Sequence, residues 1–194
     1  MFGTLWLALA SLIVSRHGLP TGPDGPVLSF LVEHRTPALT GTLRTITNLG
    51  GTLGMTIATA LAASWLAWRR AAADLILVPV TKDLVGRARP AAAEQVVVLT
   101  NPAFPSGHAL GSCTVIGVIA AVALARLTLR WLRIAVAVLA AAFVLAVGVS
   151  RLYLGVHWTT DVLAGWLLAA AWLSLCFATR PVWLRRWQPA ERPV

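Results

Sequence analysis

The sequence predicts an all-α integral membrane protein, a bundle of six helices with its functional site at the outer membrane face. The first reason is composition. Of the 194 residues, 58% are hydrophobic and 12% are charged, whereas charged residues make up about a quarter of a soluble domain. The second reason is a mean hydropathy of +0.77. The third is that four charge-free intervals reach the roughly 17–25 residues that a helix needs to cross hydrocarbon.

These four intervals are predicted to be membrane-spanning helices, and they cover residues 52–68, 109–125, 134–150 and 162–179. A shorter apolar run, residues 2–15, stands where a signal peptide would be expected. Because no basic residue precedes this run, we interpret it as a retained helix that packs against the others.

The sixth predicted span, residues 71–85, is less apolar because it contains three charged residues. Among them, Asp74 follows Arg70 by four residues. This spacing favours an ion pair near the lipid headgroups over a functional acid inside the membrane, since residues four apart are neighbours on a helix.

The segment between the first two spans, residues 16–50, begins with a turn-rich stretch of Gly and Pro. Two short helices are predicted after it, at residues 27–34 and 37–49, and we expect both to lie along the outer membrane surface. The chain shows no internal repeat and no low-complexity linker. Residues 1–194 are therefore expected to form one domain.

Three short strings of polar residues stand out from this apolar background. The first is Lys82, then six residues, then Arg89-Pro90; the second is Pro105-Ser106-Gly107-His108; the third is Ser150-Arg151, then five residues, His157, three residues and Asp161. Lys82 is the only lysine in a chain with 16 basic residues. A lysine offers a compact point charge where arginine offers a planar fork, so this exception is informative.

The pair His157 and Asp161 is spaced for one helix face at the start of the last span. The carboxylate can accept a hydrogen bond from Nδ1–H, which leaves the Nε2 lone pair free. Such an imidazole can be a general base, a metal ligand or a nucleophile. Taken alone, the spacing would favour an ordinary surface pair, and only the neighbouring strings favour chemistry.

The second string precedes a long apolar helix, so Ser106 is predicted to be its N-cap, with the following amides free to approach an anion. A plain cap would explain Ser106 and Gly107 but not His108. Around them, Lys82, Arg89 and Arg151 supply three cations. Because three fixed positive charges repel a divalent metal, the strings indicate an oxygen-rich anion such as phosphate in place of a metal ion. We expect no cofactor.

The arginine distribution predicts the orientation. If the spans alternate, nine basic residues lie on one side and seven on the other, or four once the three cations of the strings are set aside. The C-terminus is then cytoplasmic, and all three strings lie on the extracytoplasmic side. The formal charge of +9 comes mostly from arginines beside the spans, which is typical of topology signals and headgroup contacts, not of nucleic-acid binding.

In order and spacing, the three strings resemble the tripartite signature of the type 2 phosphatidic acid phosphatase and vanadium haloperoxidase superfamily. With its flanking spans the resemblance covers about residues 52–177. Many relatives carry Pro where this chain has Thr159. The resemblance implies that His157 attacks phosphorus and forms a phosphohistidine, that Asp161 holds its ring, and that His108 protonates the leaving oxygen. It implies phosphate contacts from Lys82, Arg89, Ser106, Gly107 and Arg151.

The function implied is a lipid phosphatase in the inner, or plasma, membrane. Its substrate would be phosphatidic acid, phosphatidylglycerophosphate or a polyprenyl diphosphate. Two alternatives are a vanadate-dependent peroxidase, whose known relatives are soluble and longer, and a protein that binds or moves lipid phosphates without hydrolysis. The sequence does not indicate the oligomeric state.

Overall fold

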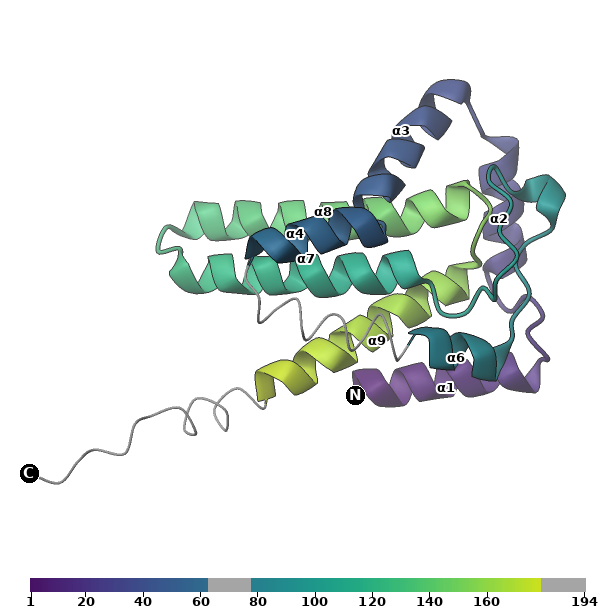
Figure 1. Cartoon of the computed structure of the whole chain (residues 1–194), viewed down its shortest axis with the longest axis horizontal. Coiled ribbons are helices and arrows are strands. Elements are labelled where there is room, and N and C mark those ends of the chain that lie inside the picture. Colours follow the sequence, from purple (N-terminus) through teal and green to yellow (C-terminus); the bar gives the residue numbers. More distant parts are fainter. Residues whose placement is uncertain (63–77, 179–194) are drawn as a thin grey trace, which may run out of the picture.

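All ordered elements in the described part of the chain, residues 1–62 and 78–178 of a computed structural model, are helices (Figure 1). The all-α prediction is confirmed for these residues. The elements are α1 (Phe2–Ser15), α2 (Asp24–Glu33), α3 (Pro37–Leu49), α4 (Thr52–Ala62), α6 (Val78–Val85), the 3₁₀ turn η2 (Ala92–Glu94), α7 (Gly107–Arg126), α8 (Arg130–Tyr153) and α9 (Thr159–Ala178).

Three of these helices are long and apolar enough to cross a membrane. They are α7 with 20 residues, α8 with 24 and α9 with 20. These helices contain three of the predicted spans, 109–125, 134–150 and 162–179, except for residue 179. Their length and composition indicate that the chain is a membrane protein. The first predicted span is the shorter apolar helix α1. The predicted spans at 52–68 and 71–85 are helical where described, in α4 and α6, and the Arg70–Asp74 pair lies outside the described residues.

The long helices pack through small residues. Helix α7 contacts both α8 and α9, and α1 packs on the far side of α9 (Figure 1). Gly165 lies so close to Ser106 and Ala109 that a Cβ atom there would approach the Ser106 carbonyl oxygen to 2.8 Å. The N-terminal ends of α7 and α9 are therefore held against each other.

The two short helices predicted within residues 16–50 are both present, as α2 and α3. Helix α3 has the predicted bounds, because Pro37 occupies its first position and the Thr36 side chain accepts a hydrogen bond from the Leu39 amide. Helix α2 begins at Asp24, three residues before the predicted start, and it contacts α8 and α9. Figure 1 shows α2 beside the end of the bundle where α8 ends and α9 begins.

Candidate active site

One end of the bundle gathers the three polar strings around a cavity of about 320 Å³. The residues that line it stand where α8 ends and where α4, α7 and α9 begin, and Figure 1 shows these helix ends together at one end of the bundle. Six of the eight predicted site residues line it: Lys82, Arg89, Gly107, His108, Arg151 and His157. The other two, Ser106 and Asp161, are fully buried.

His157 lies in the turn between α8 and α9, not on the α9 helix face that the spacing predicted. The helix begins only at Thr159, because the Asp161 carboxylate accepts the Trp158 amide hydrogen at 2.9 Å and so caps the first turn. The ring and the carboxylate are still neighbours. Nδ1 of His157 is 3.4 Å from Oδ2 of Asp161, which is longer than an ordinary hydrogen bond, and this nitrogen has no hydrogen-bond partner among the described residues.

The other ring nitrogen of His157 faces a cation. Nη1 of Arg89 is 3.2 Å from Nε2, and because a guanidinium can only donate, Nε2 is the acceptor. Burial lowers the pKa of His157 well below its usual value near 6.5, and the positive charges of Arg89, Arg151 and Lys82 lower it further. His157 is therefore neutral, with a lone pair on Nε2 directed at Arg89.

The three cations are held by the protein framework. The Lys82 ammonium donates to the Pro102 carbonyl oxygen. Arg89 donates from Nε to the Asn101 carbonyl oxygen at 2.8 Å and from Nη1 to the Val156 carbonyl oxygen. No described residue that lines the cavity carries a carboxylate, so the electrostatic field inside the cavity favours an anion.

Arg151 has spare hydrogen-bonding capacity. Its Nη1 donates to the Thr47 hydroxyl at 2.9 Å, which ties α8 to α3. Its Nε is buried and has no hydrogen-bond partner among the described residues. A buried unsatisfied donor on a charged group is costly, and an oxyanion in the cavity would satisfy it.

The second string begins α7 as predicted. Ser106 is the N-cap, and its hydroxyl accepts the Ala109 amide hydrogen at 3.5 Å. Since Ser106 is 0% exposed, its hydroxyl caps the helix behind the cavity wall. Gly107 and His108 form the wall itself, and a Cβ atom at Gly51 would lie 3.1 Å from Nε2 of His108. The start of α4 therefore borders His108.

The sequence reasoning missed three polar residues next to the site. Arg87 was counted only as a topology arginine, and Asp24 and Thr160 were given no role. In the structure, Arg87 forms ion pairs with Asp24 at 2.6 Å and with Asp161 at 2.7 Å. The side chains of Arg87 and of both aspartates are fully buried. One signal was present in the sequence: Arg87 stands two residues before Arg89 in the first string.

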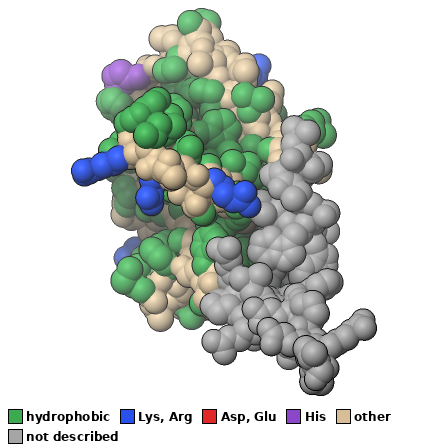
Figure 2. Space-filling view, turned by 90° about the vertical axis from the view of Figure 1, so that its left-hand side faces the viewer, with side chains coloured by type: hydrophobic (Ala, Val, Ile, Leu, Met, Phe, Trp, Pro, Cys, Tyr) green, Lys and Arg blue, Asp and Glu red, His purple; other side chains and the backbone are tan. Residues whose placement is uncertain are grey.

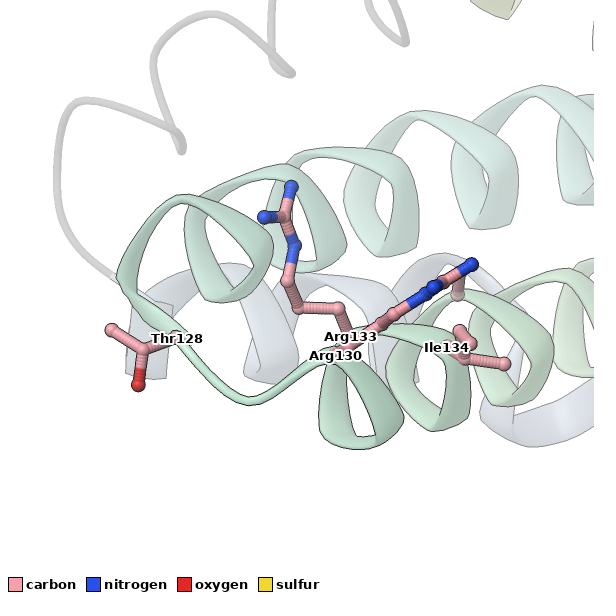
Figure 3. A pocket seen from close by; sticks show the side chains of 5 residues that line it. Thr128, Arg130, Arg133 and Ile134 are labelled. Carbon is pink, nitrogen blue, oxygen red and sulfur yellow. The ribbon is translucent and has the colours of Figure 1, made fainter.

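A second cavity, of about 490 Å³, lies at the opposite end of the bundle, where α7 turns into α8. Its wall is formed by Thr128, Arg130, Arg133, Ile134 and Ala137 (Figure 3). Figure 2 shows this end of the molecule, with basic side chains set among hydrophobic ones. None of the residues of the three strings is among the described residues that line this cavity.

The chain is similar in sequence to known proteins. The family model of the PAP2 superfamily matches residues 63–185. Phosphatidylglycerophosphatase B of Bacillus subtilis is 38% identical over 96 residues, which are 49% of this chain and 47% of that protein. An undecaprenyl-diphosphatase of Sulfolobus acidocaldarius is 35% identical over 105 residues, 52% of this chain and 46% of that protein. The chain thus matches about half the length of these relatives.

Two solved structures have the same fold. The transmembrane PAP2-type phosphatidylglycerolphosphate phosphatase from Bacillus subtilis superposes with a TM-score of 0.76 at 26% identity, covering 98% of this chain and 97% of that one. The LpxE structure from Aquifex aeolicus gives a TM-score of 0.65 at 18% identity, over 81% of this chain and 96% of the other. At that identity the second likeness concerns the fold alone.

Proposed function

Because the chain belongs to the PAP2 superfamily, we propose that it is a membrane lipid phosphatase that works through a phosphohistidine on His157. The observation that carries this proposal is the neutral, buried His157, whose Nε2 faces Arg89 in a cavity lined by cations. A neutral imidazole beside fixed positive charges is suited to attack a phosphate, because the cations stabilise the anion while the lone pair reaches phosphorus.

In the proposed first step, Nε2 of His157 forms a bond to phosphorus as the bond to the leaving oxygen breaks. Protonated His108 gives its proton to that oxygen. In the second step His108 takes a proton from water, the water oxygen attacks phosphorus, and the bond to Nε2 breaks. Inorganic phosphate leaves, and both histidines return to their starting states.

The surrounding groups have separate roles in this scheme. Lys82, Arg89 and Arg151 bind the phosphate oxygens and stabilise the charge of the transition state, and the Gly107 amide adds a donor at the start of α7. Asp161 orients His157 and stabilises its positive charge in the intermediate. Ser106 caps α7 with its hydroxyl oxygen, and in the proposed scheme the same hydroxyl is a further phosphate contact beside the Gly107 amide. No cofactor enters the scheme.

The proposed substrate is a lipid phosphate or diphosphate. The cavity of about 320 Å³ is at the small end of ligand pockets, and Leu99 is the one large apolar side chain among the described residues that line it. It is therefore suited to a phosphate headgroup, while the hydrocarbon chains would stay in the bilayer. The names of the relatives point to phosphatidylglycerophosphate or a polyprenyl diphosphate, and phosphatidic acid has the same reacting group.

We further propose a single domain of six spanning helices in the inner membrane, with the site at the outer face and the C-terminus in the cytoplasm. The positions of Arg126 and Arg130 support this orientation, because both lie at the end of the bundle opposite the site. Basic residues beside spans favour the cytoplasmic side.

The direct test is a panel of phosphatidic acid, phosphatidylglycerophosphate and a polyprenyl diphosphate, assayed for released phosphate with purified protein in detergent. We expect the wild-type protein to release phosphate from at least one of these lipids and His157→Ala to release none. A protein that binds the lipids but releases no phosphate would instead be the non-hydrolytic lipid-binding alternative.

A further inference from the structure

We propose that Asp24 and Arg87 are positioning residues for the phosphoryl-transfer reaction, acting on His157 through Asp161. This inference rests on the proposed function, and it assigns a role to two residues outside the three strings. Neither residue lines the cavity of about 320 Å³. They therefore cannot contact the substrate there, and any influence on the reaction must pass through a residue that does reach the site.

The first link is between Arg87 and Asp161. Nη1 of Arg87 donates to Oδ1 of Asp161 at 2.7 Å, while Oδ2 accepts the Trp158 amide hydrogen and faces Nδ1 of His157. With both oxygens engaged, the carboxylate has one orientation. The position of Oδ2 in front of His157 is therefore set in part by the ion pair on the other side of the carboxylate.

The second link holds Arg87 itself. Every nitrogen of its guanidinium is engaged: Nε with the Gly18 carbonyl oxygen at 3.1 Å, Nη1 with Thr160 and Asp161, and Nη2 with Asp24 at 2.6 Å. The guanidinium carbon also lies 5.7 Å from the centre of the Trp158 ring. A planar fork held at each nitrogen cannot rotate, whereas the single ammonium of a lysine could not make these contacts together.

The third link anchors the start of α2 to the start of α9. Oδ1 of Asp24 accepts the Thr160 amide hydrogen at 2.9 Å, and Oδ2 accepts the Thr21 amide hydrogen at 2.9 Å. Asp24 is 63 residues from Arg87 and 136 from Thr160 in the sequence. One side chain thus fixes three distant parts of the chain around the turn that carries His157.

The charges of this cluster suit the reaction. Asp24, Arg87 and Asp161 are each 1% exposed or less, and ionised they carry one net negative charge. His157 becomes positive when it forms the phosphohistidine, and the cluster can neutralise that charge. Buried ion pairs contribute little net stability relative to apolar residues of the same shape, so stability alone is a weak reason for such a cluster.

The test compares Asp24→Asn and Arg87→Lys with matched surface controls. Glu33→Gln makes the same charge change at an exposed position of the same helix, and Arg16→Lys makes the same change at an exposed arginine. We expect Asp24→Asn and Arg87→Lys to lower kcat by about 10-fold to 100-fold with KM changed less than about twofold, as misplacement of a reacting group does. The controls should keep both values.

A double-mutant cycle separates positioning from a structural role. If Asp24 acts through Asp161, Asp24→Asn should lower kcat by less than about twofold in an Asp161→Asn background, because coupled residues are not additive. Equal losses in both backgrounds would overturn the proposal. A variant that only destabilises the fold would lower the amount of active enzyme by the same factor in both backgrounds. Thermal unfolding in detergent measures that loss of folded protein separately.

Nitrogen-15 NMR of histidine-labelled protein in detergent gives a readout that needs no turnover. The His157 signals, identified by their loss in His157→Gln, should show the Nδ1–H tautomer in the wild type and in Glu33→Gln, and a mixture of tautomers in Asp24→Asn and Arg87→Lys. An unchanged His157 spectrum in both variants would overturn the proposal. An altered spectrum in a protein without phosphatase activity would keep the positioning role and refute the proposed function.

Discussion

Nη1 of Arg89 lies 3.2 Å from Nε2 of His157, so the guanidinium is directed at the lone pair of the proposed nucleophile. The opposite ring nitrogen faces Oδ2 of Asp161. A cation on one side and a carboxylate on the other favour the tautomer with its proton on Nδ1. A phosphate entering the cavity would meet Arg89 and Nε2 together, which defines where phosphorus must lie.

Replacing Arg89 by Gln should move the acid limb of the pH profile to higher pH. The neutral form of His157 is the reactive one, so activity is lost as pH falls through its pKa. Burial and nearby cations lower that pKa in the wild type. Removing one cation raises the pKa, and the midpoint of the acid limb in kcat/KM must rise with it.

The comparison uses one substrate for all proteins, so that ionisation of the substrate itself cancels. Arg44→Gln is the matched control, because Arg44 is an exposed arginine outside the cavity. Arg89→Gln will also lower the rate, since the side chain binds phosphate, but the midpoint is the informative quantity. An unchanged or lower midpoint would contradict the role of Arg89 in keeping His157 neutral.

Replacing His108 by Ala should have an effect that depends on the leaving group. For a lipid alkoxide we expect kcat/KM to fall by about 10²–10⁴-fold, the usual contribution of a general acid. For p-nitrophenyl phosphate the fall should be much smaller, because p-nitrophenolate departs without a proton. The ratio kcat/KM reports the first step alone. Equal losses on both substrates would refute the assignment of His108 as the proton donor.

Local patterns in the sequence predicted much of this fold. The bounds of α3 follow from Thr36 and Pro37, and the start of α7 follows from Ser106, because caps depend only on residues within one helical turn. The position of His157 in a turn was missed because Asp161 caps α9 at Trp158. The Trp158 amide and the His157 ring both face Oδ2 of Asp161, and the spacing alone does not show which of them determines where the helix begins.

The part that could not be predicted depends on contacts between distant segments. Asp24 lies in a turn-rich stretch that gave no helix signal before residue 27, and its partner Arg87 is 63 residues away. Apart from its place two residues before Arg89, nothing in the local pattern distinguishes Arg87 from an arginine at a membrane surface. Its burial at 1% exposure follows only once α1, α2 and α9 are packed together.

Chelation should leave activity nearly unchanged. Lys82, Arg89 and Arg151 already supply the positive charge that a metal ion would supply in phosphoryl transfer. Phosphate release is therefore expected to be the same with and without excess EDTA. A loss of activity that added Mg²⁺ restores would show that the three cations are not sufficient.

Two engineered cysteines should report opposite sides of the membrane. Ala92 and Thr128 are both exposed and lie at opposite ends of the bundle, so a lack of reaction would reflect the membrane and not burial. In a background without Cys113 and Cys176, Ala92→Cys should react with a membrane-impermeant maleimide in intact cells. Thr128→Cys should react only after permeabilisation, and the reverse pattern would place the site in the cytoplasm.

The central claim is the covalent bond between phosphorus and His157, and trapping that intermediate tests it most directly. His108→Ala should form the phosphoenzyme from ³²P-labelled p-nitrophenyl phosphate but hydrolyse it slowly, because the base for the second step is missing. We predict an alkali-stable, acid-labile label on the peptide that contains His157, and none in His108→Ala combined with His157→Ala. Turnover by the wild type without any such label in His108→Ala would contradict the account.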